Sequence, residues 1–111
     1  MRRALGLACL FAALWGHLSA SSVRAGKAVC FITGYVGTGY RTATGVWPQV
    51  HHTVAVDPAF IPYGAHVRIA GLPWTLRAED TGALGWGHLD VFMSSVGEAY
   101  ALTSYRACHW W

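Results

Sequence analysis

Short runs of β-forming residues, each closed by a turn signal, fill the chain from Thr53 to Met93. Proline, glycine or Asp-Thr-Gly ends each run. Turn signals at intervals of about 8–12 residues are typical of small β-sandwiches and β-barrels. The expected strands are 28–35, 53–56, 66–70, 74–79, 88–93 and 105–111. The sequence therefore predicts a mostly β fold of five or six short strands closed into a small barrel.

A single segment has the pattern of a helix. Ser95 and Glu98 stand three residues apart and form a capping box at its start. Val96, Ala99 and Tyr100 then share one face at helical spacing. We expect one helix of roughly two turns, and an exposed loop over the glycine- and threonine-rich stretch 37–45.

The N-terminus has the three parts of a secretory signal peptide. A basic start precedes the apolar run Ala4–Leu18, and small residues follow as far as Ala25. The run is shorter than the about 20 residues that span a membrane. We expect cleavage after Ala20 or Ala25, with a retained N-terminal anchor as the alternative. The predicted organisation is a signal peptide, 1–25, and one domain, 26–111, secreted to the periplasm or cell wall and not membrane-bound after cleavage.

Cleavage leaves two cysteines, Cys30 and Cys108. A cysteine pair in a small secreted domain is typical of a disulfide, although two free thiols are the alternative. A domain of this size is marginally stable without such a link. A disulfide closing so long a loop is worth about 4 kcal/mol in the chain-entropy model. We expect a monomer held by this bond.

Charge and metal-ligand spacing argue against two classes of function. The chain has 8 basic and 5 acidic side chains, and two of the basic ones, Arg2 and Arg3, lie in the leader. The basic cluster of a nucleic-acid-binding protein is missing. Five histidines remain after the leader, but they lack the spacing of a zinc site, so we expect neither a metal nor a cofactor: they are His51, His52, His66, His88 and His109.

The three aspartates, Asp57, Asp80 and Asp90, lie in or directly after these β-forming runs. Carboxylates among apolar residues are costly unless paired, and such groups concentrate at functional sites. Asp90 stands between Leu89 and Val91, where desolvation favours the protonated form that a general acid needs. Asp80 is a candidate stabilising or orienting carboxylate. Asp57 and Asp80 also fit ordinary turn chemistry.

Three segments together resemble the 3D domain family, which is named for its three aspartates. They read V-A-V-D-P-x-x-I-P-x-G at 54–64, A-x-D-T-G at 78–82 and G-x-x-D-V-F at 87–92. The resemblance implies a six-stranded double-psi β-barrel similar to that of membrane-bound lytic transglycosylase A. It also implies glycan strands of peptidoglycan as the substrate.

The resemblance further implies a catalytic assignment. In the transglycosylase reaction one aspartic acid protonates the oxygen between N-acetylmuramic acid and N-acetylglucosamine. The same group then takes the proton of the muramoyl 6-hydroxyl, which attacks C1 and leaves a 1,6-anhydro sugar. By motif position this residue is Asp90, with Asp80 and Asp57 around it.

The segment between Asp80 and Asp90 departs from the family pattern. It is one residue shorter, and glycine, tryptophan and His88 replace the family's lysine and arginine. The second hypothesis is therefore a non-catalytic, expansin-like module that binds the cell wall. Most aromatic side chains in so small a domain fill or cover its core, but an exposed ring beside a groove would stack on sugars. The expected substrate-binding residues are Trp86, His88, Thr81 and Tyr35.

Overall fold

The computed structural model describes residues 24–111. The predicted signal peptide, 1–25, lies outside the described residues except for its last two positions, and so does the possible cleavage position at Ala20. Within 24–111 there is no helix whose length and hydropathy would allow it to span a bilayer.

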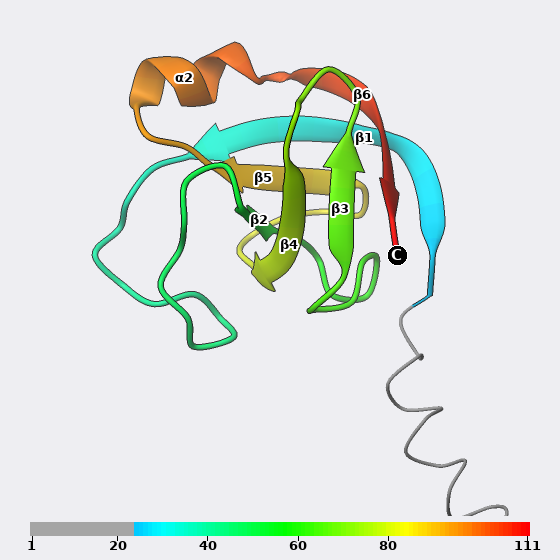
Figure 1. Cartoon of the computed structure of the whole chain (residues 1–111), viewed down its shortest axis with the longest axis horizontal. Helices are drawn as coiled ribbons and strands as arrows, with labels where there is room; N and C mark the ends of the chain where they lie inside the picture. The colour runs from blue at the N-terminus through cyan, green and yellow to red at the C-terminus, as the bar shows by residue number, and fades with distance from the viewer. Residues whose placement is uncertain (1–23) are drawn as a thin grey trace, which may run out of the picture.

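The described chain forms six strands and one short helix, as the sequence predicts (Figure 1). The strands close into a barrel in the order β1-β5-β2-β4-β3-β6. The mostly β, six-stranded closed barrel is thereby confirmed. The elements are β1 (Gly26–Tyr35), β2 (Thr53–Ala55), β3 (His66–Ile69), β4 (Thr75–Asp80), β5 (His88–Phe92), α2 (Val96–Ala101) and β6 (Ser104–Trp110).

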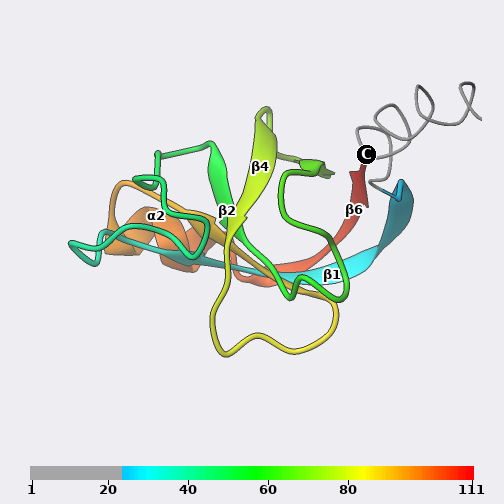
Figure 2. The same cartoon turned by 90° about the horizontal axis from the view of Figure 1, so that it is seen from below.

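The long strand β1 closes the barrel, because it pairs with both β5 and β6. It pairs with β6 in antiparallel fashion over Gly26–Ile32 and with β5 in parallel fashion over Phe31–Tyr35. Figure 1 shows it as the long arrow that arches over β5 toward α2. The segment 81–87, which joins β4 to β5, projects away from the strands (Figure 2). One face of the barrel therefore combines residues from β1, β5, β2 and β4.

Alternating residues of the strands fill the core, because successive side chains of a strand point to opposite faces. Ile32, Leu76, Leu89 and Val91 have no exposed surface. Their neighbours along β1 and β5, such as Thr33 and Asp90, are only partly buried. This alternation turns Thr33 and Asp90 to the outer face of the barrel.

A disulfide joins the first and last strands, Cys30 in β1 to Cys108 in β6. Both cysteines are buried in the core, at exposures of 0% and 3%. The predicted pairing is confirmed. Because the link closes a separation of 78 residues, it restricts the unfolded chain strongly.

Helix α2 begins at the predicted capping residue but buries a narrower face than expected. The Ser95 hydroxyl accepts the Glu98 N–H at 3.1 Å. Val96, Ala99 and Tyr100 lie in the helix as predicted, but only Ala99 is buried, whereas Val96 and Tyr100 are 57% and 76% exposed. The contact with β1 is made through Gly34, where an added Cβ would lie 2.7 Å from the Cα of Ala99. This close approach leaves no room for a side chain at position 34.

Candidate functional site

Asp80 and Asp90 lie at the same level of the barrel, on either side of β2. Ala55 pairs with Asp90 of β5 and with Asp80 of β4. The second pairing depends on a bulge, because Val54 pairs with Ala78 and the register then skips Glu79. Neighbouring strands are about 4.8 Å apart, so the two aspartate Cα atoms are about 10 Å apart. The bulge thus brings the two carboxylates into one row.

Asp90 is half-buried and receives one side-chain hydrogen bond. Thr33, its register partner on β1, donates from Oγ1 to Asp90 Oδ1 at 2.8 Å. Burial raises the pKa of Asp90, and the negative charge of Asp80 raises it further, while the Thr33 bond and His88 act in the opposite direction. A carboxyl that holds its proton more tightly than usual is suited to general-acid catalysis.

Asp80 has a different set of partners. Tyr35 donates its hydroxyl to Oδ2, and the backbone N–H groups of Ala43 and Thr81 donate to Oδ1, each at 2.9 Å. Three donors on the two oxygens suit an ionised carboxylate, which only accepts. Burial raises the pKa of Tyr35, and its bond to Asp80 adds to this effect, so the phenol remains a donor. Asp80 is therefore a fixed negative charge beside Asp90.

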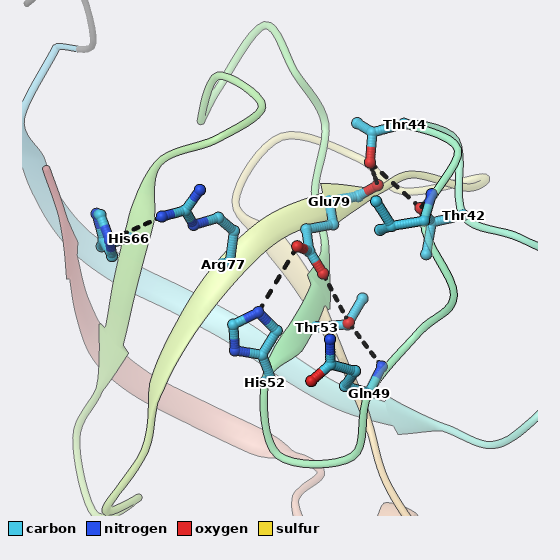
Figure 3. A network of polar contacts seen from close by, with 9 residues as sticks. Thr42, Thr44, Gln49, His52, Thr53, His66, Arg77 and Glu79 are labelled. Atoms are coloured by element: carbon cyan, nitrogen blue, oxygen red, sulfur yellow. Dashed lines mark hydrogen bonds and ion pairs between the residues drawn. The ribbon is translucent and has the colours of Figure 1, made fainter.

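A second polar network holds the end of β4 where Asp80 begins its turn (Figure 3). The Glu79 carboxylate accepts from the fully buried Thr53 hydroxyl at 2.9 Å and lies 3.6 Å from His52 Nε2. The Glu79 carbonyl accepts the Thr44 hydroxyl at 2.8 Å. These bonds dock the loop between β1 and β2 onto β4, and they place the Ala43 N–H on Asp80. The stretch 37–45, expected as an exposed loop, is mostly exposed and is also part of the site.

His88 contacts Asp90 through a third residue. Its Nε2 atom lies 2.7 Å from the Thr33 hydroxyl that also binds Asp90. The structure therefore brings four of the predicted site residues together: Tyr35, Asp80, His88 and Asp90. Sequence reasoning missed Thr33, since a threonine in a β-forming run is typical of any strand.

The side chains of Asp57 and Thr81 bond to backbone groups of the turns rather than to the other two aspartates. The Asp57 carboxylate accepts the N–H of Ala59 at 2.9 Å, as in an ordinary turn. The Thr81 hydroxyl donates to the carbonyl of Val56 at 2.6 Å. The Thr81 bond ties the turn after β4 to the end of β2, whereas the Asp57 bond lies within the turn after β2. Among the hydrogen bonds of residues 24–111, none joins the Asp57 carboxylate to Asp80 or Asp90.

Trp86 packs away from the two carboxylates. Its ring lies 4.8 Å from the ring of Phe60, which in turn lies 5.0 Å from that of Trp110. A hollow of about 430 Å³ opens beside these three rings. Trp86 is 71% exposed and so remains accessible. Its partners belong to the turn after β2 and to the end of β6, not to the Asp80–Asp90 row.

A row of aromatic rings adjoins Asp90 instead. Tyr105 of β6, Phe31 of β1 and His88 of β5 are register neighbours, with ring centroids 5.1 and 5.2 Å apart. Tyr105 is 74% exposed. Phe31 precedes Thr33 by two residues on the same strand, so the rings and the acid share one face. Sequence reasoning missed Phe31 and Tyr105, although the alternation of Phe31 with Cys30 and Ile32 was a usable signal.

The other histidines of the described chain make separate contacts. His51 stacks on Trp74, at 4.0 Å between ring centroids, and pairs with Glu98 at 3.1 Å. His66 accepts from Arg77 at 3.1 Å (Figure 3). In residues 24–111 no three metal-binding side chains converge on a common point.

No protein-family model and no curated protein matches the chain. Among solved structures, the lytic transglycosylase LtgG of Burkholderia pseudomallei is similar, with a TM-score of 0.51 and 24% sequence identity. The match covers 65% of this chain and 26% of the other, so the chain spans about a quarter of that enzyme. At this identity the likeness shows the fold, a barrel also found in a lytic transglycosylase. Membership in the 3D family stays a prediction.

Proposed function

We propose that this protein cleaves glycan strands of peptidoglycan by lytic transglycosylase chemistry, with Asp90 as the general acid and base. The observation that carries the proposal is the difference between the surroundings of Asp90 and those of Asp80, which lie in one row. Asp90 is a half-buried acid with a raised pKa, and it lies two strands from Asp80, whose carboxylate accepts three hydrogen bonds. The fold shared with LtgG supports the same reaction class.

In the proposed reaction, Asp90 gives its proton to the oxygen between N-acetylmuramic acid and N-acetylglucosamine. Asp80 remains ionised and stabilises the positive charge that develops on the sugar ring. The Asp90 anion then takes the proton of the muramoyl 6-hydroxyl as that oxygen bonds to C1. Asp90 ends the cycle protonated, and the product is a 1,6-anhydro sugar.

The setting of the enzyme is part of the proposal. A disulfide between Cys30 and Cys108 fits an extracytoplasmic location, since such bonds form in oxidising compartments. We place the protein in the periplasm or cell wall as a monomer, after loss of residues 1–25. Asp57 and Thr81 support the turns beside the site, and Tyr35 and His88 act within it.

The test is incubation of purified protein with peptidoglycan sacculi, followed by mass spectrometry of the released fragments. Active protein yields anhydro-muropeptides. Asp90→Asn, which keeps the size of the side chain, abolishes them. Glu98→Gln on α2 is the matched carboxylate-to-amide control and keeps the yield. Release of the same products by the Asp90→Asn protein would refute the assignment.

The row formed by Tyr105, Phe31 and His88 favours a second candidate, a wall-binding module without lytic activity. An exposed tyrosine beside a phenylalanine offers apolar ring faces to a sugar. This candidate predicts co-sedimentation with sacculi and no new sugar ends. Tyr105→Ala then loses binding, whereas Tyr100→Ala keeps it, because Tyr100 is equally exposed, at 76% against 74%, but lies on α2.

A further inference from the structure

The hydroxyl of Thr33 lies between two titratable groups. It is 2.8 Å from Asp90 Oδ1 and 2.7 Å from His88 Nε2. Both separations are within the reach of direct proton transfer, about 2.6–3.2 Å. Thr33 pairs with Asp90 in the β1–β5 register, and Phe31 pairs with His88. The two strands therefore hold the three groups in line.

The chemistry of a hydroxyl limits how these groups bond. A hydroxyl carries one proton to donate and two lone pairs that accept. If Thr33 donates to an ionised Asp90, it accepts from His88, whose Nε2 must carry a proton. If Asp90 is protonated and donates to Thr33, then Thr33 donates to an unprotonated Nε2. Both arrangements satisfy all three groups. The two hydrogen bonds run from His88 to Asp90 in the first and from Asp90 to His88 in the second.

We propose that Thr33 is a positioning residue that relays a proton between His88 and Asp90. The imidazolium of His88 passes its Nε2 proton to Thr33 Oγ1, while Thr33 passes its own hydroxyl proton to Asp90 Oδ1. One N–H and one O–H bond break, and two O–H bonds form. No proton enters or leaves, and an ion pair becomes a neutral pair. This relay rests on the proposed function in one respect: it supplies Asp90 with its proton before a glycan strand binds.

The surroundings of the relay favour its neutral state. Facing Asp90 and His88 are Tyr35 on β1, Asp80 on β4 and, beyond Phe31, Tyr105 on β6, while β2 presents no titratable side chain. Burial and the charge of Asp80 raise the pKa of Asp90. The protonated form of Asp90 is therefore more favoured here than in water. The imidazole of His88 also lies in the segment between Asp80 and Asp90, where the 3D family pattern has a lysine and an arginine that this chain lacks.

The relay is tested by NMR on the intact protein as a function of pH. The ¹⁵N shifts of His88 and the carboxyl ¹³C shift of Asp90 are followed in the wild type, Thr33→Val and Thr33→Ser. At alkaline pH the wild-type imidazole is expected to carry its proton on Nε2. Thr33→Val removes the donor, so the pKa of Asp90 rises and the imidazole loses its fixed tautomer. Thr33→Ser restores both properties.

Coupling between the three residues gives a stricter measure. The effect of Thr33→Val on the pKa of Asp90 is smaller in a His88→Gln background, because the bonds act as one chain. His66, which is bonded to Arg77, is the control and titrates identically in all variants. Thr33→Ala replaces Thr33→Val if the valine protein does not give a folded spectrum.

Three results would each overturn the relay. The first is identical NMR titration curves of Asp90 in the wild type and Thr33→Val, and the second is an imidazole protonated on Nδ1 alone beside an ionised Asp90. The third is that the effects of Thr33→Val and His88→Gln on the pKa of Asp90 simply add. These measurements need no turnover, so they stand if the proposed function fails. If the protein is active, the alkaline limb of its pH profile for kcat shifts to higher pH in Thr33→Val. In Thr33→Ser it returns to the wild-type position. An unchanged limb would reduce Thr33 to a structural residue.

Discussion

Asp80 and Asp90 are the same residue type at matching positions beside Ala55, yet their surroundings differ. Asp80 ends its strand, and two backbone N–H groups and a phenol saturate it. Asp90 lies within its strand, half-buried, with one hydroxyl donor. When their environments shift the pKa values of two carboxyl groups apart, one can act as a general acid and the other as a stabilising charge. The neighbours, rather than the motif, decide the role of each aspartate.

The largest expected effect is the activity difference between the two carboxyl-to-amide variants. Asp90→Asn removes the proton donor, and lytic activity on sacculi falls by about 10²–10⁴, the usual contribution of a general acid. Asp80→Asn removes only a stabilising charge and loses less. Rates of anhydro-muropeptide release measure both. Equal losses, or a larger loss at Asp80, would break the proposed division of roles.

The same two variants are expected to change stability in opposite directions. Asp80→Asn places an NH₂ group among three donors and destabilises the fold by about 0.5–1.5 kcal/mol, the usual net contribution of a hydrogen bond, because the site is only partly buried. Denaturant unfolding at neutral pH measures this loss. Asp57→Asn is the matched control, because the amide oxygen can still accept the Ala59 N–H.

Asp90→Asn stabilises the fold at neutral pH. Because burial raises the pKa of Asp90 in the folded state, the folded wild type loses stability as pH rises through that pKa. In acid, where folded and unfolded chains both hold the proton, the advantage of the amide disappears. Thermal unfolding over a pH series reports the sign, and a variant less stable than wild type at neutral pH contradicts it.

Tyr35→Phe sharpens the comparison by removing one of the three donors of Asp80. The expected loss of stability is about 1 kcal/mol, a typical value for one hydrogen bond. Tyr100→Phe, on exposed α2, is the matched control and leaves the unfolding midpoint in place. An equal shift in both variants would remove Tyr35 from the network.

The smallest effect is expected from Thr44→Val, which removes one hydroxyl bond between the loop and β4. Stability falls by about 0.5–1.5 kcal/mol or less. The local readout is sharper, because the loop carries the Ala43 N–H that binds Asp80. Hydrogen exchange at Ala43 quickens in Thr44→Val. Unchanged exchange would show that the loop is held by other contacts.

The sequence by itself determined the strands, the disulfide and the outward direction of Asp90. Alternation of Leu89, Asp90 and Val91 sets which side of β5 meets the core, because the period of a strand is two. The cysteine pair followed from the small size of the domain and from the secretion that its N-terminus predicts. These features depend on local pattern and composition, which the chain carries in any conformation.

Tertiary structure decided which groups meet. Three of the four donors to Asp90 and Asp80 are Thr33, Tyr35 and Ala43, which are 57, 45 and 37 residues away from their acceptors. A bulge at Glu79, invisible in the pattern of β-formers, aligned the two carboxylates. Strand register and loop docking depend on the whole barrel closing at once, so contacts of this range have no signature in a local stretch of sequence.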